Sequence, residues 1–188
     1  MPSISFDNPY YLITSVTHNR LPIFGTDELK RILAGAFTQA RETSGMQVLA
    51  YVLMPDRYHV ITDDRLKPAD VIRYVNGISA RKVINHLKQS GDEATLNELR
   101  VEEQSKDFRY SLWDTEPGTS SLTSSGLLVE MTDFVHQEPV VNGLVEDASE
   151  YTFSSVRYWQ KKPLLADEPI VVDVKDLVGV LLDTPRVK

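Results

Sequence analysis

The sequence predicts an α+β fold in which helices pack on one face of an antiparallel sheet, in the ferredoxin-like arrangement. The first observation is a hairpin, because two apolar runs, Val48–Met54 and Tyr58–Thr62, flank the turn signal Pro55-Asp56-Arg57. The second is the order of the predicted elements, which is strand, helix, strand, strand, helix, strand. That order is typical of a sheet with helices over one face.

The second strand of this hairpin carries the side chains of most interest. Side chains alternate between the two faces of a sheet along a strand. We therefore expect Arg57 and His59 to point to the same side and Tyr58 to point to the other.

The first strand and the first helix precede the hairpin. Tyr10–His18 alternates and is rich enough in β-branched residues to form a strand. Thr26 is the predicted N-cap of the helix that follows, and Gly45 is a natural stop at its end. The apolar residues of this helix recur at helical spacing: Leu29, Ile32, Leu33, Ala36, Phe37 and Ala40.

A second helix begins near Pro68, a residue that suits the first turn of a helix. The segment Ser90–Asp107 after it is polar and acidic, and the sequence leaves open whether it is a loop or a frayed helix. The buried stripe of the second helix comprises Val71, Ile72, Val75, Ile78, Val83 and Leu87.

The last elements are a strand, a loop and a helix. Phe108–Trp113 is the candidate for the fourth strand, and Glu116–Ser125, with its Pro, Gly, Ser and Thr residues, is predicted to be a loop. A helix starts near Ser124 or Ser125, and Pro139 limits its extension.

Composition narrows the class of protein. A chain of 188 residues with 41% hydrophobic residues is one globular domain by default. Cysteine is absent, which excludes disulfides and thiolate metal sites. No apolar run is long enough to cross a bilayer, and the N-terminus lacks the pattern of a signal peptide, so we expect a cytoplasmic protein.

Charge is distributed unevenly along the chain. The net charge of -7 argues against a general nucleic-acid binder. However, Arg57–Lys88 holds seven basic and three acidic residues, whereas Gln89–Glu150 holds three basic and fourteen acidic residues. Any nucleic-acid footprint should lie on the first region, although solvated helix faces would explain the same pattern.

Four segments of the chain resemble one known family. MPDRYHVI, Met54–Ile61, is similar to the MPNHVHLL-type metal-binding strand of single-tyrosine HUH transposases, especially the REP-associated tyrosine transposases. Tyr11–Phe24 is similar to the opening strand and loop of that family, and Asp133–Val145 to its YIHxNPVRAGLV segment. Glu150–Trp159 is similar to its closing Y-x-W-S-S stretch, and all four segments occur in the family's order.

The resemblance implies a fold, a domain organisation and an activity. It covers about Tyr10–Tyr158, which implies a transposase-like HUH domain over residues 1–160 and a C-terminal extension of unknown role over 161–188. The family has the ferredoxin-like core and carries out DNA transposition of mobile elements. Its tyrosine hydroxyl attacks a DNA phosphodiester and becomes joined to a 5′ phosphate, while a divalent metal polarises that phosphate.

The residues that the resemblance assigns to this chemistry are altered here. Phe134 occupies the position of the nucleophilic tyrosine and has no hydroxyl. Arg57 replaces the first metal-binding histidine by a permanent cation, which leaves His59 and Glu138 as a degenerate metal pair. Glu138 follows Phe134 by one helical turn, and a salt bridge between Arg57 and Glu138 would satisfy both charges without a metal.

These substitutions predict a protein without strand-cleavage activity and without a cofactor, or with Mg or Mn if the site is still active. A structural interpretation makes His59 a hydrogen-bonded strand residue and Phe134 a core residue on the stripe of Leu127 and Met131. Other tyrosines could replace the nucleophile: Tyr58, Tyr74, Tyr110 and Tyr151.

Three functions remain open from the sequence. The first is a transposase-family protein that binds single-stranded or hairpin DNA without cutting it, as a monomer or homodimer and without a membrane. The second is a nicking or strand-transfer enzyme that uses a non-standard site with His59 and Glu138, and the third is a repurposed protein-interaction module, which the acidic surface would suit. The candidate DNA-binding residues are Arg57, Arg73, Arg81, Lys82 and Lys88.

Overall fold

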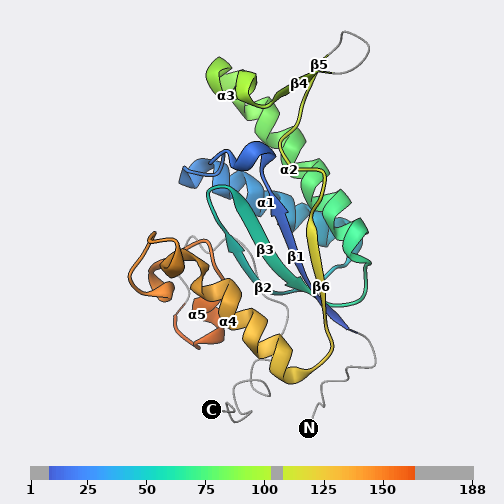
Figure 1. Cartoon of the computed structure of the whole chain (residues 1–188), viewed down its shortest axis with the longest axis vertical. Coiled ribbons are helices and arrows are strands. Elements are labelled where there is room, and N and C mark those ends of the chain that lie inside the picture. Colours follow the sequence, from blue (N-terminus) through green and yellow to red (C-terminus); the bar gives the residue numbers. More distant parts are fainter. Residues whose placement is uncertain (1–8, 103–107, 164–188) are drawn as a thin grey trace.

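A four-stranded antiparallel sheet forms the centre of the protein in the computed structural model, which describes residues 9–102 and 108–163 (Figure 1). Its strands lie in the order β2, β3, β1, β6. Their bounds are β1 Tyr10–Val16, β2 Val48–Leu53, β3 Arg57–Thr62 and β6 Gly118–Leu122. The predicted hairpin is confirmed, because β2 and β3 pair antiparallel with Leu53 opposite Tyr58.

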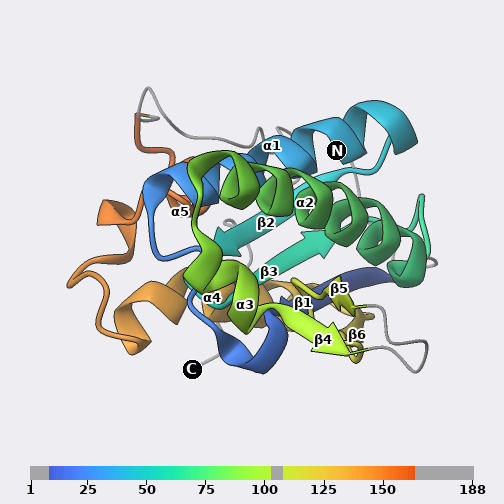
Figure 2. The ribbon, with the colours of Figure 1, turned by 90° about the horizontal axis from the view of Figure 1, so that it is seen from above.

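Helices cover both faces of this sheet. The two long helices α1 (Asp27–Ser44) and α2 (Pro68–Ser90) lie over one face, as predicted, and α4 (Ser125–Val141) lies over the other (Figure 2). The remaining elements in the described chain are short: α3 Glu93–Glu98, α5 Val156–Trp159, the β4–β5 pair Arg100–Glu102 and Phe108–Tyr110, and 3-10 turns at His18–Arg20 and Ala148–Glu150. The α+β, ferredoxin-like class is confirmed, with α4 as an additional layer.

The helix ends follow the capping chemistry of the sequence. Thr26 Oγ1 accepts a hydrogen bond from Leu29 N at 3.3 Å, and Gly45 ends α1 with φ of 73°, a conformation that suits glycine. Ser124 Oγ accepts from Leu127 N at the start of α4. Pro139 does not end this helix, which continues to Val141.

The fourth strand differs from the sequence prediction. The sequence predicts Phe108–Trp113 as the fourth strand, but Phe108–Tyr110 is β5 and pairs with β4. The end of the predicted segment makes a single bridge beside β1, between Trp113 and Thr17. The strand beside β1 is instead β6, inside the predicted loop Glu116–Ser125. Four of its five residues are exposed, so a sequence of Gly, Thr and Ser fits an edge strand that has little apolar surface to bury.

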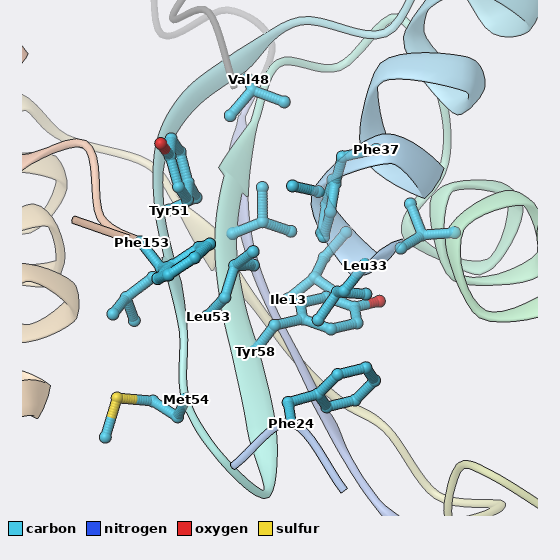
Figure 3. Packing of buried hydrophobic residues seen from close by; sticks show 14 of the residues in the cluster. Ile13, Phe24, Leu33, Phe37, Val48, Tyr51, Leu53, Met54, Tyr58 and Phe153 are labelled. Carbon is cyan, nitrogen blue, oxygen red and sulfur yellow. The ribbon is translucent and has the colours of Figure 1, made fainter. Parts of the chain in front are cut away.

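The apolar core covers both faces of the sheet, and a large part of it lies between the sheet and α1 (Figure 3). Ile13, Leu33, Phe37 and Tyr58 are fully buried there, and the Phe37 and Tyr58 rings meet edge to face with centroids 5.0 Å apart. The Tyr58 hydroxyl also donates to Asn76 Oδ1 of α2 at 2.9 Å. Tyr58 therefore points away from the face of Arg57 and His59, as the strand alternation predicts.

The outer edge of β2 is covered by the segment before α5. Leu53 N donates to Phe153 O at 2.9 Å, and Ser155 N donates to Tyr51 O at 3.0 Å. Tyr51 N in turn donates to Ser155 Oγ at 2.9 Å. These bonds pair backbone groups of β2 that would otherwise be unpaired at the edge of the sheet. They also hold residues 153–155, which lead into α5, against β2.

Two predictions reach the limits of the described residues. Residues 164–188 lie outside them, so the predicted C-terminal extension stays a prediction. Ser90–Asp107 is partly described, as α3 and β4, and 103–107 lies outside. Over the described parts of the chain, none of the helices is long and apolar enough to cross a membrane.

Substituting Tyr58→Phe should lower the free energy of unfolding by about 1–2 kcal/mol, because Asn76 Oδ1 then loses a buried hydrogen-bond donor. Urea unfolding measured by circular dichroism gives this difference. Tyr74→Phe on α2 is the control, since it removes a hydroxyl that lies outside this network. Equal stability of the Tyr58 variant and wild type would contradict the assigned hydrogen bond.

Candidate functional site

The candidate site lies between β3 and α4, on the face of the sheet opposite α1 and α2. Arg57 and His59 project from β3, and Phe134 and Glu138 lie one helical turn apart on α4. Contacts between the strand and the helix bring these four side chains together. We call these four residues and Asp56 the Arg57–Glu138 cluster.

An ion pair joins the strand to the helix. The Arg57 guanidinium donates to Glu138 Oε2 from Nε at 3.1 Å and from Nη2 at 2.5 Å. Its third nitrogen, Nη1, donates to Asp56 Oδ1 at 2.6 Å. Both side chains of the Arg57–Glu138 pair are largely buried, with exposed fractions of 14% and 11%. The predicted salt bridge between Arg57 and Glu138 is therefore present. Each of these bonds joins the Arg57 cation to a carboxylate, which makes it stronger than a bond between neutral groups.

His59 is held on the same surface by strand register. Thr14 lies directly opposite His59 in the β1–β3 pairing, and its Oγ1 is 2.7 Å from His59 Nδ1. His59 Nε2 is 3.3 Å from Glu138 Oε2, although it makes no well-aligned hydrogen bond. The tautomer with its proton on Nε2 suits both contacts, because Nδ1 can then accept from the Thr14 hydroxyl.

The electrostatics of the cluster keep the carboxylate ionised. The contact with His59 and the hydrogen bonds and charge of Arg57 lower the pKa of Glu138 to about 2, although burial opposes this shift. The pKa of Arg57 is raised; burial acts to lower it and is outweighed by its bonds and proximity to Glu138 and Asp56. Each charge thus stabilises the other.

Phe134 lies beside His59 but not in the core. The two rings meet edge to face with centroids 5.3 Å apart. The residue is 42% exposed, so the expectation that it packs in the core on the Leu127 and Met131 stripe is wrong. Phe134 therefore reaches solvent, and phenylalanine supplies no hydroxyl at this place.

The residues present do not fit a divalent metal ion. Metal ligands direct lone pairs at the ion, whereas Arg57 directs N–H donors at Glu138 Oε2, the oxygen that also faces His59. A permanent cation at this place also repels a second positive charge. Among the residues that the structure describes, no three His, Asp or Glu side chains gather as a metal site.

Of the four tyrosines considered as replacements for the nucleophile, two are buried and two lie on other elements. Tyr58 is fully buried on the opposite face, and the Tyr151 hydroxyl donates to Leu53 O in a buried position at 2.7 Å. Burial raises the pKa of both phenols. Tyr74 lies on α2 and Tyr110 on β5, and neither element contributes to the cluster.

The predicted DNA-binding residues do not share one surface. Arg57 belongs to the cluster on the α4 face, whereas Arg73, Arg81, Lys82 and Lys88 lie on α2 across the sheet. Arg73 pairs with Asp70 at 3.0 Å, and Lys88 lies over the Tyr110 ring. DNA contact by these residues stays a prediction.

Sequence reasoning missed two members of the site environment. Asp56 was taken only as a turn residue, yet its carboxylate accepts from Arg57 and its carbonyl accepts from Thr17 N at 2.8 Å. Thr14 carries no motif signal, and only the β1–β3 register brings it to His59. A turn aspartate directly before a strand arginine is a signal that could have indicated the first contact.

The low pKa of Glu138 gives stability a specific pH dependence. Glu138 stays ionised in the folded protein down to about pH 2, whereas in the unfolded chain it takes up a proton near its ordinary value of 4.5. The unfolded state therefore binds more protons between these values, and falling pH removes the stabilisation. Wild type should lose more stability between pH 5 and pH 2 than Glu138→Gln.

The measurement is urea unfolding at a series of pH values. At neutral pH Glu138→Gln should cost about 3 kcal/mol, because it leaves Arg57 without its buried partner. Glu130→Gln is the matched control, since Glu130 is an exposed residue of the same helix and should leave the pH profile unchanged. Parallel profiles for wild type and Glu138→Gln would contradict the assigned shift.

Comparison with known proteins agrees with this fold. The protein-family description "Transposase IS200 like" matches residues 5–98, which is half of the chain. A solved structure of a REP-associated tyrosine transposase bound to a REP hairpin is similar with a TM-score of 0.56 and 14% identity, over 94% of this chain and 93% of that one. A candidate transposase from Deinococcus radiodurans R1 has a TM-score of 0.45 and 15% identity, over 73% of this chain and 96% of that one. No curated protein matches the chain.

The family match covers the strand of Arg57 and His59, and the chain belongs to the IS200-like transposase family.

Proposed function

We propose that the protein binds single-stranded or hairpin DNA and does not cleave it by the tyrosine and metal chemistry of its family. The observation that carries the proposal is the Arg57 guanidinium bound twice to Glu138 Oε2, in the place where the resemblance implies a metal. Phe134 beside it offers no nucleophilic hydroxyl. The metal site and the nucleophilic hydroxyl act as one unit in this chemistry, so the loss of both supports a complete loss of cleavage rather than a slower reaction.

DNA binding is supported by the family and by a groove on the helical face. A similar solved structure is described as bound to a REP hairpin. Between α1 and α2 lies a groove of about 590 Å³. It is lined by Glu28, Arg31, Ile32, Gly35, Lys82, Asn85, His86 and Gln89. Two cations and two side-chain amides here suit phosphate oxygens, with Glu28 as the one opposing charge.

The basic residues of α2 extend this groove toward solvent. Lys82 lines the groove on the flank of α2 that faces α1, and Arg81 and Lys88 lie two turns apart on the exposed side. A DNA backbone that crosses α2 can contact both sides of the helix. Arg57 is not available for this role, because Glu138 and Asp56 occupy its donors.

The first test is a search for covalent product. Wild-type protein incubated with single-stranded DNA hairpins and Mg or Mn should give no shifted band on a denaturing gel. Arg57→His combined with Phe134→Tyr restores the family pattern and should give a band, whereas each single substitution should give none. A band from wild type would contradict the proposal and support the non-standard enzyme.

The second test locates the DNA. Charge reversal of Arg81 and Lys82 (R81E/K82E) should weaken binding of unrelated single strands by about tenfold or more at low salt. The slope of log affinity against log salt should fall by about 2, since fewer counterions are released. Fluorescence anisotropy of labelled DNA at several KCl concentrations measures both.

The control reverses two exposed charges elsewhere, with Arg20→Glu and Arg65→Glu in one protein, outside the α1–α2 groove. It changes the net charge equally and should have the smaller effect. An equal loss of DNA affinity in the two proteins would indicate that the DNA does not contact α2. No binding of wild type at low salt would contradict the proposal and favour a protein-interaction module.

A further inference from the structure

A second cavity lies on the side of α4 that faces away from the Arg57–Glu138 cluster. It has a volume of about 420 Å³, within the range of small-ligand pockets. It is lined by Thr132, Asp133, His136 and Gln137 of α4, by Val156 and Trp159 of α5, and by Gln160. Helical spacing places Thr132 and His136 on the opposite side of α4 from Phe134 and Glu138.

The floor of this cavity is held rigidly by the sheet. His136 Nε2 is 2.8 Å from Ser155 Oγ, which itself accepts from Tyr51 N. Trp159 Nε1 donates to Leu49 O at 2.9 Å, and the rings of His136 and Trp159 have centroids 6.1 Å apart. Ordered aromatic groups lose little entropy when a ligand binds.

The charges of the cavity define the ligand class. Burial lowers the pKa of His136 to about 3, so its ring is neutral at ordinary pH. No Lys or Arg belongs to the lining, which disfavours phosphate or carboxylate inside. The exposed rim supplies the carboxylate of Asp133 and the amides of Gln137 and Gln160, which suit a neutral group with several N–H donors.

Two lysines follow the cavity residue Gln160 in the chain. Lys161 and Lys162 follow Gln160 directly and are exposed, and Lys162 Nζ reaches Ser149 Oγ at 2.9 Å. A cavity without a cation in its lining, beside a basic segment, suits a nucleotide in a strand, with the base inside and the phosphates outside. The volume fits one base and is too small for a duplex.

We propose that this cavity binds one unpaired nucleobase that carries an amino group, with guanine preferred. The carboxylate of Asp133 can accept from both N1–H and the N2 amino group of guanine, whereas thymine offers it a single ring N–H. This inference rests on the proposed DNA binding and gives it a base-reading site separate from the backbone contacts of α2.

The test uses the indole signals of the full chain, which has two tryptophans. In a ¹H–¹⁵N spectrum, the Trp159 indole signal should shift saturably with 2′-deoxyguanosine and far less with thymidine. Trp113 is the internal control, because its Nε1 donates to Ser79 Oγ in the core. Trp113→Phe assigns the two signals.

Asp133→Asn should weaken the deoxyguanosine response by about tenfold, because it replaces a charged acceptor by an amide. Glu130→Gln on the same helix lies outside the cavity and should leave it unchanged. No saturable shift of Trp159, an equal response to thymidine, or an unchanged response in Asp133→Asn would each overturn the inference.

Single-stranded DNA separates this inference from the proposed function. Binding of DNA that leaves the Trp159 signal unmoved supports the proposed function and overturns the base site. A Trp159 response to deoxyguanosine without DNA binding at low salt supports the base site and overturns the proposed function. A Trp159 shift with guanine-containing strands, absent with oligo-dT, supports both.

Discussion

The alternation of side chains along β3 sets up the rest of the structure. Tyr58 enters the core under α1 and α2, where it meets Phe37 and donates to Asn76. Its neighbours Arg57 and His59 therefore emerge together on the α4 face. A slip of one residue in the β1–β3 register would bury a guanidinium under α1 and expose a tyrosine, which explains why the register is tightly specified.

Charge balance then fixes the position of α4 over this face. A largely buried guanidinium is costly without partners, and Arg57 finds them in Glu138 and Asp56. Glu138 in turn is buried mainly against Arg57 and His59, which hold its carboxylate ionised. Arg57 and Glu138 are chemically complementary, because either one alone would leave an unmatched charge in a confined space.

Much of the fold and of the cluster could be predicted from the sequence, because local signals and long-range contacts agree there. Thr26, Gly45 and Ser124 cap helices where their chemistry indicates. Spacing places Arg57 with His59 on one strand face and Phe134 with Glu138 on one helix face, and the family resemblance implies that the two pairs meet. The β6 strand was missed because its Gly, Thr and Ser residues carry loop chemistry, and pairing with β1 alone makes them a strand. Thr14 was missed for a related reason, since register is a property of two strands.

The exposure of Phe134 shows what the helix pattern leaves undetermined. Leu128, Thr132 and Val135 form the buried side of α4, and Phe134 lies beyond the edge of that side. A second set of bonds also joins α4 to the sheet, through His136 to Ser155, which is tied to Tyr51 of β2. His136 and Ser155 belong to the two closing segments of the family resemblance, and neither lies in the cluster. The helix α4 is thus attached to the sheet at two places, and the attachment through His136 and Ser155 does not involve residues 57 and 134.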